Sequence, residues 1–333
     1  MKWSHNLKTL RHGMRLATSV ARAELGLVWP APQPPAMPPA AAGMPEVAER
    51  GGDFGVLRMR EYVPAMPLPP HRPLVVLLHG CGQDAAAFAA DSGWIAAAER
   101  LGFPLVLPEQ AEANNQGRCF RWFQPAHTAR DQGEVGAIAA MVRDAVERHS
   151  SDPARVFVVG LSAGGAMAAA VAAAYPDLFA AGAAVAGLPV GAAGSTVQAL
   201  ARMAQAGPSR SPEEWARQVR QAGPSGFNGP WPRMSIWQGA ADTVVAPENA
   251  ALLAVQWRAL HGLPEVPISD VTEAGVRCRR WGKAGSPAVE LWTLPAMAHG
   301  YPVGEGQGRE ARFLPASPVA ATPRIAAFWG LAA

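Results

Sequence analysis

The stretch VFVVGLSAGGAM, residues 156–167, decides the fold. It opens with a β-rich apolar run, turns at Gly160-Leu161-Ser162-Ala163-Gly164 and continues into small residues that suit a closely packed helix. A Gly-x-Ser-x-Gly pattern between a strand and a helix is a nucleophile elbow, a tight turn that exposes the serine. A Gly-rich turn with an incidental serine would give the same letters, but the flanking strand and helix favour the elbow. Ser162 is therefore the predicted nucleophile.

On both sides of this stretch, short apolar runs typical of buried parallel strands alternate with helical patterns. The expected strands are residues 54–63, 73–78, 103–107, 155–159, 181–186, 234–238 and 289–294, and the expected helices are 84–101, 131–148, 163–175, 247–260 and 323–330. Asp131 and Glu134 are predicted to form the capping pair of the helix at 131–148. The alternation predicts an α/β fold with a mostly parallel central sheet covered by helices on both faces.

Composition divides the chain into three parts. In residues 1–28, apolar side chains recur at three- and four-residue steps among basic ones, which predicts a basic amphipathic helix. Residues 29–51 are rich in Pro and Ala and are expected to form an extended linker. Residues 52–333 are the predicted catalytic domain, in which 192–232 is a candidate lid or cap. The first part holds one acidic and five basic residues: Glu24, Lys2, Lys8, Arg11, Arg15 and Arg22.

Charge and composition exclude several classes of function. The formal charge of the chain is +3, and the +4 of residues 1–28 leaves −1 for the rest, which argues against a nucleic-acid-binding body. No apolar run is long enough for a transmembrane segment.

The basic helix suits a granule or another lipid-like surface, although it could equally dock on the body. Since no clear signal peptide is present, a cytoplasmic and granule-associated location is expected. No metal site or cofactor motif is found, so the expected chemistry needs neither.

A serine hydroxyl needs a neighbouring base and an orienting carboxylate to become a nucleophile. In α/β-hydrolases the acid and then the histidine follow the serine in the chain. His299 lies shortly after the expected strand at 289–294, whereas His261, the other downstream histidine, ends a helix. Asp242 follows a strand and a Gly turn, a setting that three other acids downstream of Ser162 lack: Asp177, Asp270 and Glu273. The predicted triad is Ser162, Asp242 and His299.

An oxyanion hole requires two backbone N–H donors. The predicted donors are Ala163, which follows the nucleophile, and Cys81, in the loop after the expected strand at 73–78. His79 in that loop is expected to be a structural histidine rather than the base. The candidates for substrate contact are Trp122, Tyr301 and Gln110.

Several blocks in one order resemble the catalytic domain of the poly(3-hydroxybutyrate) depolymerase family of esterases. The blocks are LHGCGQ at 78–83, PEQ at 108–110, CFRWF at 119–123, GLSAGGAM at 160–167, GLP at 187–189 and WQG at 237–239 with Asp242. The resemblance spans about residues 55–305. It implies a serine carboxylic-ester hydrolase with the α/β-hydrolase fold, and the triad positions of the family fall on the residues chosen above.

The resemblance leaves the substrate open. It implies a polyhydroxyalkanoate depolymerase or oligomer hydrolase, and alternatively an esterase of feruloyl, acetyl or other small esters. A serine peptidase of the same fold and a non-catalytic granule-surface protein are the rival classes. Cys81 and Cys119 belong to resembling blocks, so they are either a disulfide near the site or two buried thiols.

Overall fold

The computed structural model describes residues 47–52, 57–208 and 210–331. The predicted helix at 1–28 and most of the predicted linker at 29–51 lie outside the described residues, so these boundaries stay predictions.

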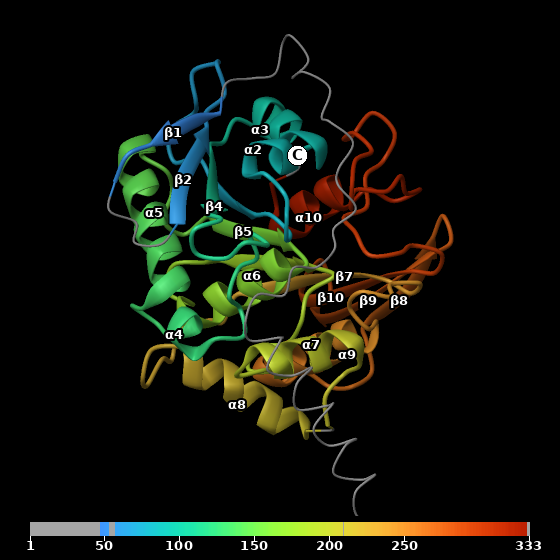
Figure 1. The fold of residues 1–333 in the computed structure, drawn as a ribbon. Coiled ribbons are helices and arrows are strands. Elements are labelled where there is room, and N and C mark those ends of the chain that lie inside the picture. The colour runs from blue at the N-terminus through green and yellow to red at the C-terminus, as the bar shows by residue number, and fades with distance from the viewer. Residues whose placement is uncertain (1–46, 53–56, 209, 332–333) are drawn as a thin grey trace, which may run out of the picture. The chain divides into compact units, whose positions relative to one another are not determined.

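A single sheet runs through the described part of the chain, with the strand order β1-β2-β4-β3-β5-β6-β7-β10-β9-β8 (Figure 1). Strands β4, β3, β5, β6, β7 and β10 are parallel to one another, and antiparallel strands complete both edges. The strands are β1 Ala48–Arg50, β2 Leu57–Tyr62, β3 Leu74–Leu78, β4 Leu105–Gln110, β5 Val156–Leu161, β6 Ala181–Val185, β7 Arg233–Gly239, β8 Ser269–Glu273, β9 Val276–Lys283 and β10 Ser286–Leu294.

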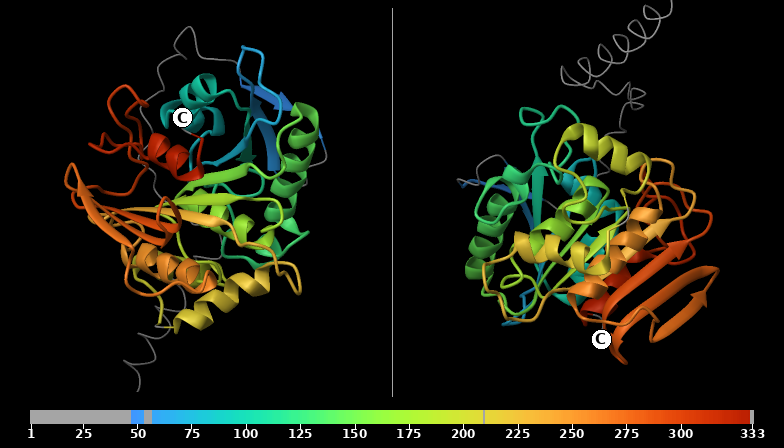
Figure 2. Two further views of the ribbon diagram at one scale, coloured as in Figure 1. Left: turned by 180° about the vertical axis from the view of Figure 1, so that it is seen from behind. Right: turned by 90° about the horizontal axis from the view of Figure 1, so that it is seen from below.

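Helices cover both faces of this sheet, because successive strand side chains point to opposite sides. In β5, Val156 and Val158 enter one apolar core, whereas Phe157 and Val159 enter the other. Figures 1 and 2 show α2, α3 and α10 together on one side and α8 and α9 on the other. The helices are α2 Ala85–Asp91, α3 Trp94–Leu101, α4 Pro125–Thr128, α5 Gly133–His149, α6 Ala163–Ala174, α7 Thr196–Ala204, α8 Pro212–Ala222, α9 Glu248–Leu260 and α10 Ala321–Trp329. The predicted mostly parallel, helix-covered sheet is confirmed.

Two expected helices differ in detail. The helix at 84–101 is divided into α2 and α3, because Gly93 adopts a φ of 83° and a side chain there would lie 2.2 Å from the Gln307 carbonyl oxygen. The predicted capping pair is wrong. Asp131 has a φ of 63°, α5 begins at Gly133, and the Glu134 side chain bonds to residues outside the helix.

The candidate lid at 192–232 contains α7 and α8, and side chains of α9 hold this segment. Gln256 donates to the carbonyl oxygens of Val190 and Trp215, and Asn249 donates to that of Arg202. A lid function stays a prediction. Within the described ranges, no helix is both long and apolar enough to cross a membrane.

Candidate active site

Ser162 lies in the turn between β5 and α6 in a strained backbone conformation, with φ 58° and ψ −118°. Its N–H donates to the carbonyl oxygen of Val185 at the end of β6 (2.8 Å). The turn closes so tightly that a Cβ on Gly160 would lie 2.1 Å from the Gly164 carbonyl oxygen. A non-glycine residue at positive φ costs free energy and is found preferentially at functional sites. This geometry is that of a nucleophile elbow.

Asp242 and His299 are directly paired, with 2.7 Å between Oδ2 of the carboxylate and Nδ1 of the ring. The second oxygen, Oδ1, accepts the N–H groups of Val244 and Val245 (2.8 and 2.9 Å), and Oδ2 also accepts the Gln238 side-chain amide (2.9 Å). Burial raises the pKa of Asp242, but the hydrogen bonds from His299 and the two backbone N–H groups outweigh burial and lower that pKa below its ordinary value. An ionised Asp242 fixes the proton of His299 on Nδ1 and leaves Nε2 free to act as a base.

Backbone contact between two loops brings this pair together. Gly239 ends β7, and a Cβ there would lie 2.2 Å from the carbonyl oxygen of Met297, in the loop after β10. Ala240 and Ala241 donate their N–H groups to Leu294 and Met297 of the same region (2.9 and 3.1 Å). Only a glycine permits this approach of the loop that holds Asp242 to the loop that holds His299.

The other downstream candidates are engaged elsewhere. His261 contacts the carbonyl oxygen of Pro232, directly before β7, and therefore lies at the opposite end of the sheet from His299. The three alternative acids named above are each paired with an arginine: Asp177 with Arg130, Asp270 with Arg277 and Glu273 with Arg324.

The two predicted oxyanion donors also lie at the carboxyl ends of neighbouring parallel strands, β3 and β5. A Cβ on Gly164 would lie 2.2 Å from the Leu78 carbonyl oxygen and 2.5 Å from that of His79, so the first turn of α6 packs directly on the end of β3. In the part of the chain that the structure describes, the N–H groups of Cys81 and Ala163 donate to no other protein group. Both remain available to a substrate oxygen.

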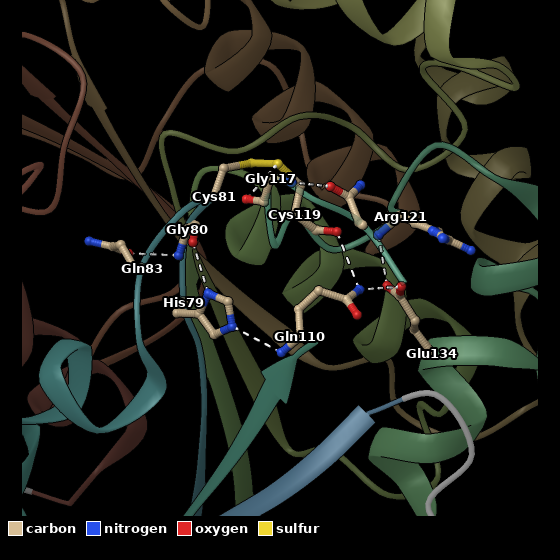
Figure 3. The surroundings of a disulfide bond; sticks show 10 residues. His79, Gly80, Cys81, Gln83, Gln110, Gly117, Cys119, Arg121 and Glu134 are labelled. Carbon is tan, nitrogen blue, oxygen red and sulfur yellow. Dashed lines mark hydrogen bonds between the residues drawn. A yellow bond between two sulfur atoms is a disulfide. The ribbon is translucent and has the colours of Figure 1, made fainter. Parts of the chain in front are cut away.

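A disulfide joins Cys81 to Cys119 (Figure 3), which decides between the two states that the sequence left open. His79 is fully buried beside it and packs on Phe120. Burial lowers the pKa of His79 to about 4, so the ring is neutral at physiological pH. His79 is structural, as expected.

The predicted substrate contacts are not supported by their surroundings. The Tyr301 side chain is fully buried, and its hydroxyl bonds to Trp94 Nε1 and Thr322 Oγ1 (2.9 and 2.8 Å), so it belongs to the core. Gln110 uses its amide for bonds inside the protein. Trp122 is 7% exposed and packs in the core against Phe123.

Sequence reasoning missed two residues near the carboxyl ends of the parallel strands. Gln238 supports Asp242, and its place in the WQG block was the available signal. Glu134 bonds to Gln110 (2.6 Å), and no local pattern distinguishes that role from helix capping. Among the described residues, no group of three or more metal-ligating side chains lies together.

Comparison with known proteins identifies relatives. Residues 59–280 match the family described as Esterase PHB depolymerase, a range that includes Ser162 and Asp242. The chain is 42% identical over 264 residues to poly(3-hydroxyalkanoate) depolymerase C of Paucimonas lemoignei, covering 79% of this chain and 63% of that protein. It is 37% identical to an acetylxylan esterase of Coprinopsis cinerea, covering 69% of this chain and 62% of the relative. The chain thus spans less than two thirds of the length of these two relatives.

A solved structure shows the same fold. The acetyl xylan esterase from Aspergillus awamori superposes with a TM-score of 0.73 at 24% identity, covering 86% of this chain and 100% of that one. At this identity the likeness establishes the fold alone.

Proposed function

Because this chain belongs to the PHB depolymerase family of esterases, we propose that it hydrolyses carboxylic esters with Ser162 as the nucleophile. The observation that carries the proposal is the Asp242–His299 pair, whose Oδ2 and Nδ1 atoms lie 2.7 Å apart, at the carboxyl ends of the parallel strands, where the strained Ser162 also lies. The proposed substrate is a polyhydroxyalkanoate or its oligomers.

In the proposed mechanism, Nε2 of His299 takes the Ser162 hydroxyl proton as Oγ attacks the ester carbonyl carbon. The carbonyl oxygen becomes an oxyanion and accepts the N–H groups of Cys81 and Ala163. The carbon–oxygen bond to the leaving alcohol then breaks, and His299 returns the proton to that alcohol. Water, deprotonated by His299, attacks the acyl-enzyme and releases the acid and free Ser162.

Exposed apolar side chains on the Asp242 loop and on the helix attached to it support an apolar polyester over a hydroxyl-rich polysaccharide as the substrate. Val244, two residues after Asp242, is 37% exposed, and Val197 and Leu200 of α7 are 51% and 39% exposed. The end of α7 is attached to the same loop, because Ala246 donates its N–H to the Met203 carbonyl oxygen (2.8 Å). Exposed apolar groups beside a reactive centre suit a substrate with an apolar surface.

We further propose that residues 1–28 attach the enzyme to a granule or lipid-like surface. Their basic and apolar pattern, described above from the sequence, supports this role.

The cytoplasmic, granule-associated location stays a proposal too. The Cys81–Cys119 disulfide favours an oxidising compartment instead, so thiol trapping in fractionated cells is the appropriate test. Free thiols at Cys81 and Cys119 in the cytoplasmic fraction, in addition to the unpaired Cys278, support the proposal, and a disulfide-bonded protein outside that fraction contradicts it.

The deciding experiment measures release of 3-hydroxybutyrate from amorphous polyhydroxybutyrate granules by the intact protein and by Ser162→Ala. Release that disappears in the variant supports the depolymerase. If the intact protein cleaves only soluble acetyl, butyryl or feruloyl esters, the small-ester alternative replaces it.

Labelling with a fluorophosphonate tests the rival classes. The intact protein is expected to be labelled and Ser162→Ala is not. Absence of labelling in both would favour a non-catalytic protein, and cleavage of peptides without esters would favour a peptidase.

A further inference from the structure

We propose that Gln110, Glu134 and His79 are positioning residues that hold the Cys81 N–H in place as an oxyanion donor. The proposal rests on the ester hydrolase function proposed above and adds residues that the triad does not include. Figure 3 shows the group around the disulfide: Gln110 at the end of β4, Glu134 on α5, and His79 and Cys81 in the loop after β3.

His79 acts on the peptide unit that carries the donor. Its Nδ1–H donates to the carbonyl oxygen of Gly80 (2.8 Å), and its Nε2 accepts the backbone N–H of Gln110 (3.1 Å). The Gly80 carbonyl and the Cys81 N–H belong to one planar trans peptide and point in opposite directions. Fixing the carbonyl toward His79 therefore aims the Cys81 N–H away from it.

The neutral state of His79 is required for this bridge. A protonated ring would present two N–H donors, and its Nε2–H would face the Gln110 N–H. Burial lowers the pKa of His79 to about 4, which keeps one ring nitrogen an acceptor at neutral pH. The Gly80 carbonyl also accepts the N–H of Gln83 (3.2 Å), which holds the same peptide from a second side.

Gln110 and Glu134 fix the loop on the other side of the disulfide. Gln110 Nε2 donates to Glu134 Oε1 (2.6 Å) and to the carbonyl oxygen of Cys119 (3.3 Å). Its Oε1 accepts the Ala111 N–H (3.1 Å) and the Asn114 side-chain amide (2.9 Å). Every hydrogen-bonding position of this amide is therefore used, and its orientation is set by the protein.

Glu134 holds Gln110 and the backbone of Arg121 in place. Its second oxygen accepts the N–H of Arg121 (2.7 Å), and His127 Nδ1 lies 3.7 Å from the first. The side chain is fully buried in the first turn of α5. An ionised carboxylate can accept from both Gln110 and Arg121, whereas a carboxamide at this position would oppose an N–H donor to one of them.

The contacts made by His79 and those made by Gln110 and Glu134 both act on Cys81. The disulfide transmits the position of Cys119 to Cys81, and Gly82 donates its N–H to the Gly117 carbonyl oxygen (2.8 Å). Cys81 is thus held through its side chain and through both neighbouring peptides, while its own N–H is left for the substrate. A shift of His79, or of Gln110 with Glu134, therefore moves the Cys81 N–H without touching Ser162, Asp242 or His299.

The test compares hydrolysis of p-nitrophenyl butyrate by the full chain and by Glu134→Gln at a pH well above 7, the approximate pKa of the Glu134 carboxyl, so that the carboxylate is ionised. Loss of one whole oxyanion donor costs about 10²- to 10³-fold in kcat, so partial misplacement is expected to lower kcat about 10-fold with KM unchanged. A trifluoromethyl ketone, whose adduct carries the oxyanion, is expected to bind weaker by the same factor.

Glu290→Gln is the matched control, because Glu290 is also a buried glutamate with hydrogen-bonding partners, Ser235 and Arg280, outside this group. It is expected to lose stability and to keep kcat, KM and inhibitor affinity. Equal kcat losses in Glu134→Gln and Glu290→Gln would overturn the proposal, since a general structural effect would then suffice.

Two substitutions of His79 separate positioning from folding. His79→Asn keeps a donor for the Gly80 carbonyl and is expected to retain kcat within about 5-fold, whereas His79→Ala removes it and is expected to lose about 100-fold. If His79→Ala does not fold, the Cys81→Ala/Cys119→Ala double variant, which keeps the N–H and removes the disulfide, replaces it with an expected 10-fold loss in kcat. Unchanged kcat in the folded variants overturns the positioning role, whereas an intact protein without esterase activity overturns the proposed function itself.

Discussion

The Asp242 carboxylate has a separate task for each oxygen. Oδ1 organises the loop through Val244 and Val245, and Oδ2 faces the His299 ring and the Gln238 amide. In Asp242→Asn, an amide nitrogen replaces one of the two oxygens and faces N–H donors, which it repels. The single remaining oxygen cannot serve both tasks. We expect kcat for a soluble ester to fall about 10³- to 10⁴-fold, because His299 loses its fixed tautomer.

Asp177→Asn is the control for this prediction, since Asp177 is another acid downstream of Ser162 but pairs with Arg130. It is expected to leave kcat unchanged. The assignment of Asp242 would be contradicted by a loss below 10-fold in Asp242→Asn or by an equal loss in Asp177→Asn.

Burial makes Glu134 a source of pH-dependent stability. Burial raises the pKa of Glu134 from its ordinary value of 4.5 to about 7, against the opposing hydrogen bonds from Arg121 and Gln110. Between pH 4.5 and 7 the folded protein therefore binds more protons at this site than the unfolded chain. Stability must then fall as pH rises through this window, by about 3 kcal/mol for this group.

Urea unfolding of the intact protein and of Glu134→Gln from pH 4.5 to 7.5 checks this prediction. The difference between the two unfolding free energies is expected to change across the window in favour of Glu134→Gln at the higher pH. Parallel curves would show that Glu134 does not titrate there.

Residues whose chemistry follows a strand end could be predicted from the sequence, and residues that depend on distant partners could not. Asp242 follows β7 and His299 follows β10. These two strands pair in parallel, and the structure places the two side chains in contact. Tyr301 lies two residues after His299, but its hydroxyl meets Trp94 and Thr322 in the core. Glu134 stands where a helix cap is expected, and only the folded chain brings it to Gln110.

At the scale of elements, the packing of α6 on β3 couples the nucleophile to the oxyanion loop. In Gly164→Ala the added Cβ would overlap backbone atoms of Leu78 and His79, which cannot move aside as a side chain could. We expect a loss of stability of about 1–3 kcal/mol and a fall in kcat of about 100-fold, since small displacements of reacting groups are costly. Unfolding in urea and hydrolysis of p-nitrophenyl butyrate measure the two effects.

Gly194→Ala is the corresponding control, because a Cβ there would meet only the Gln198 side-chain oxygen at 3.5 Å, an ordinary contact. It is expected to change neither property. If Gly164→Ala behaved like it, the close approach of α6 to β3 would not matter for catalysis.

The parallel strands could be predicted because a strand buried on both faces is apolar throughout, as LVVLL in β3 is. The antiparallel strands β8 and β9 were missed, since they are partly exposed and rich in charge. In β9, buried Val276 and Cys278 alternate with the more exposed Arg277 and Arg279, and this period of two was the available signal. Helix α7 was missed for a related reason, because Ala199 is its only fully buried residue in the described structure.

For the whole molecule, the distribution of charge supports the proposed separation of surface attachment from catalysis. Residues 1–28 carry +4, and the rest of the chain, with its −1, contains the site. Replacing the five basic residues of this segment by Gln should therefore weaken action on a surface and spare hydrolysis in solution. With basic side chains contributing about 1 kcal/mol each near an anionic surface, hydrolysis of phosphatidylglycerol-coated polyhydroxybutyrate granules is expected to fall at least about 10-fold. The kcat for p-nitrophenyl butyrate should not change.

Salt provides an independent check of this attachment. Raising the ionic strength from about 0.01 to 1 M shortens the screening length from about 30 to 3 Å, so the intact protein should lose most of its advantage on coated granules over the five-Gln variant. Hydrolysis of the soluble ester should respond equally in both proteins, since the segment takes no part in it. An advantage of the intact protein that persists at high salt would show that the five side chains do not act through their charge, and equal granule rates of the two proteins at low salt would show that the charge of residues 1–28 does not carry the attachment.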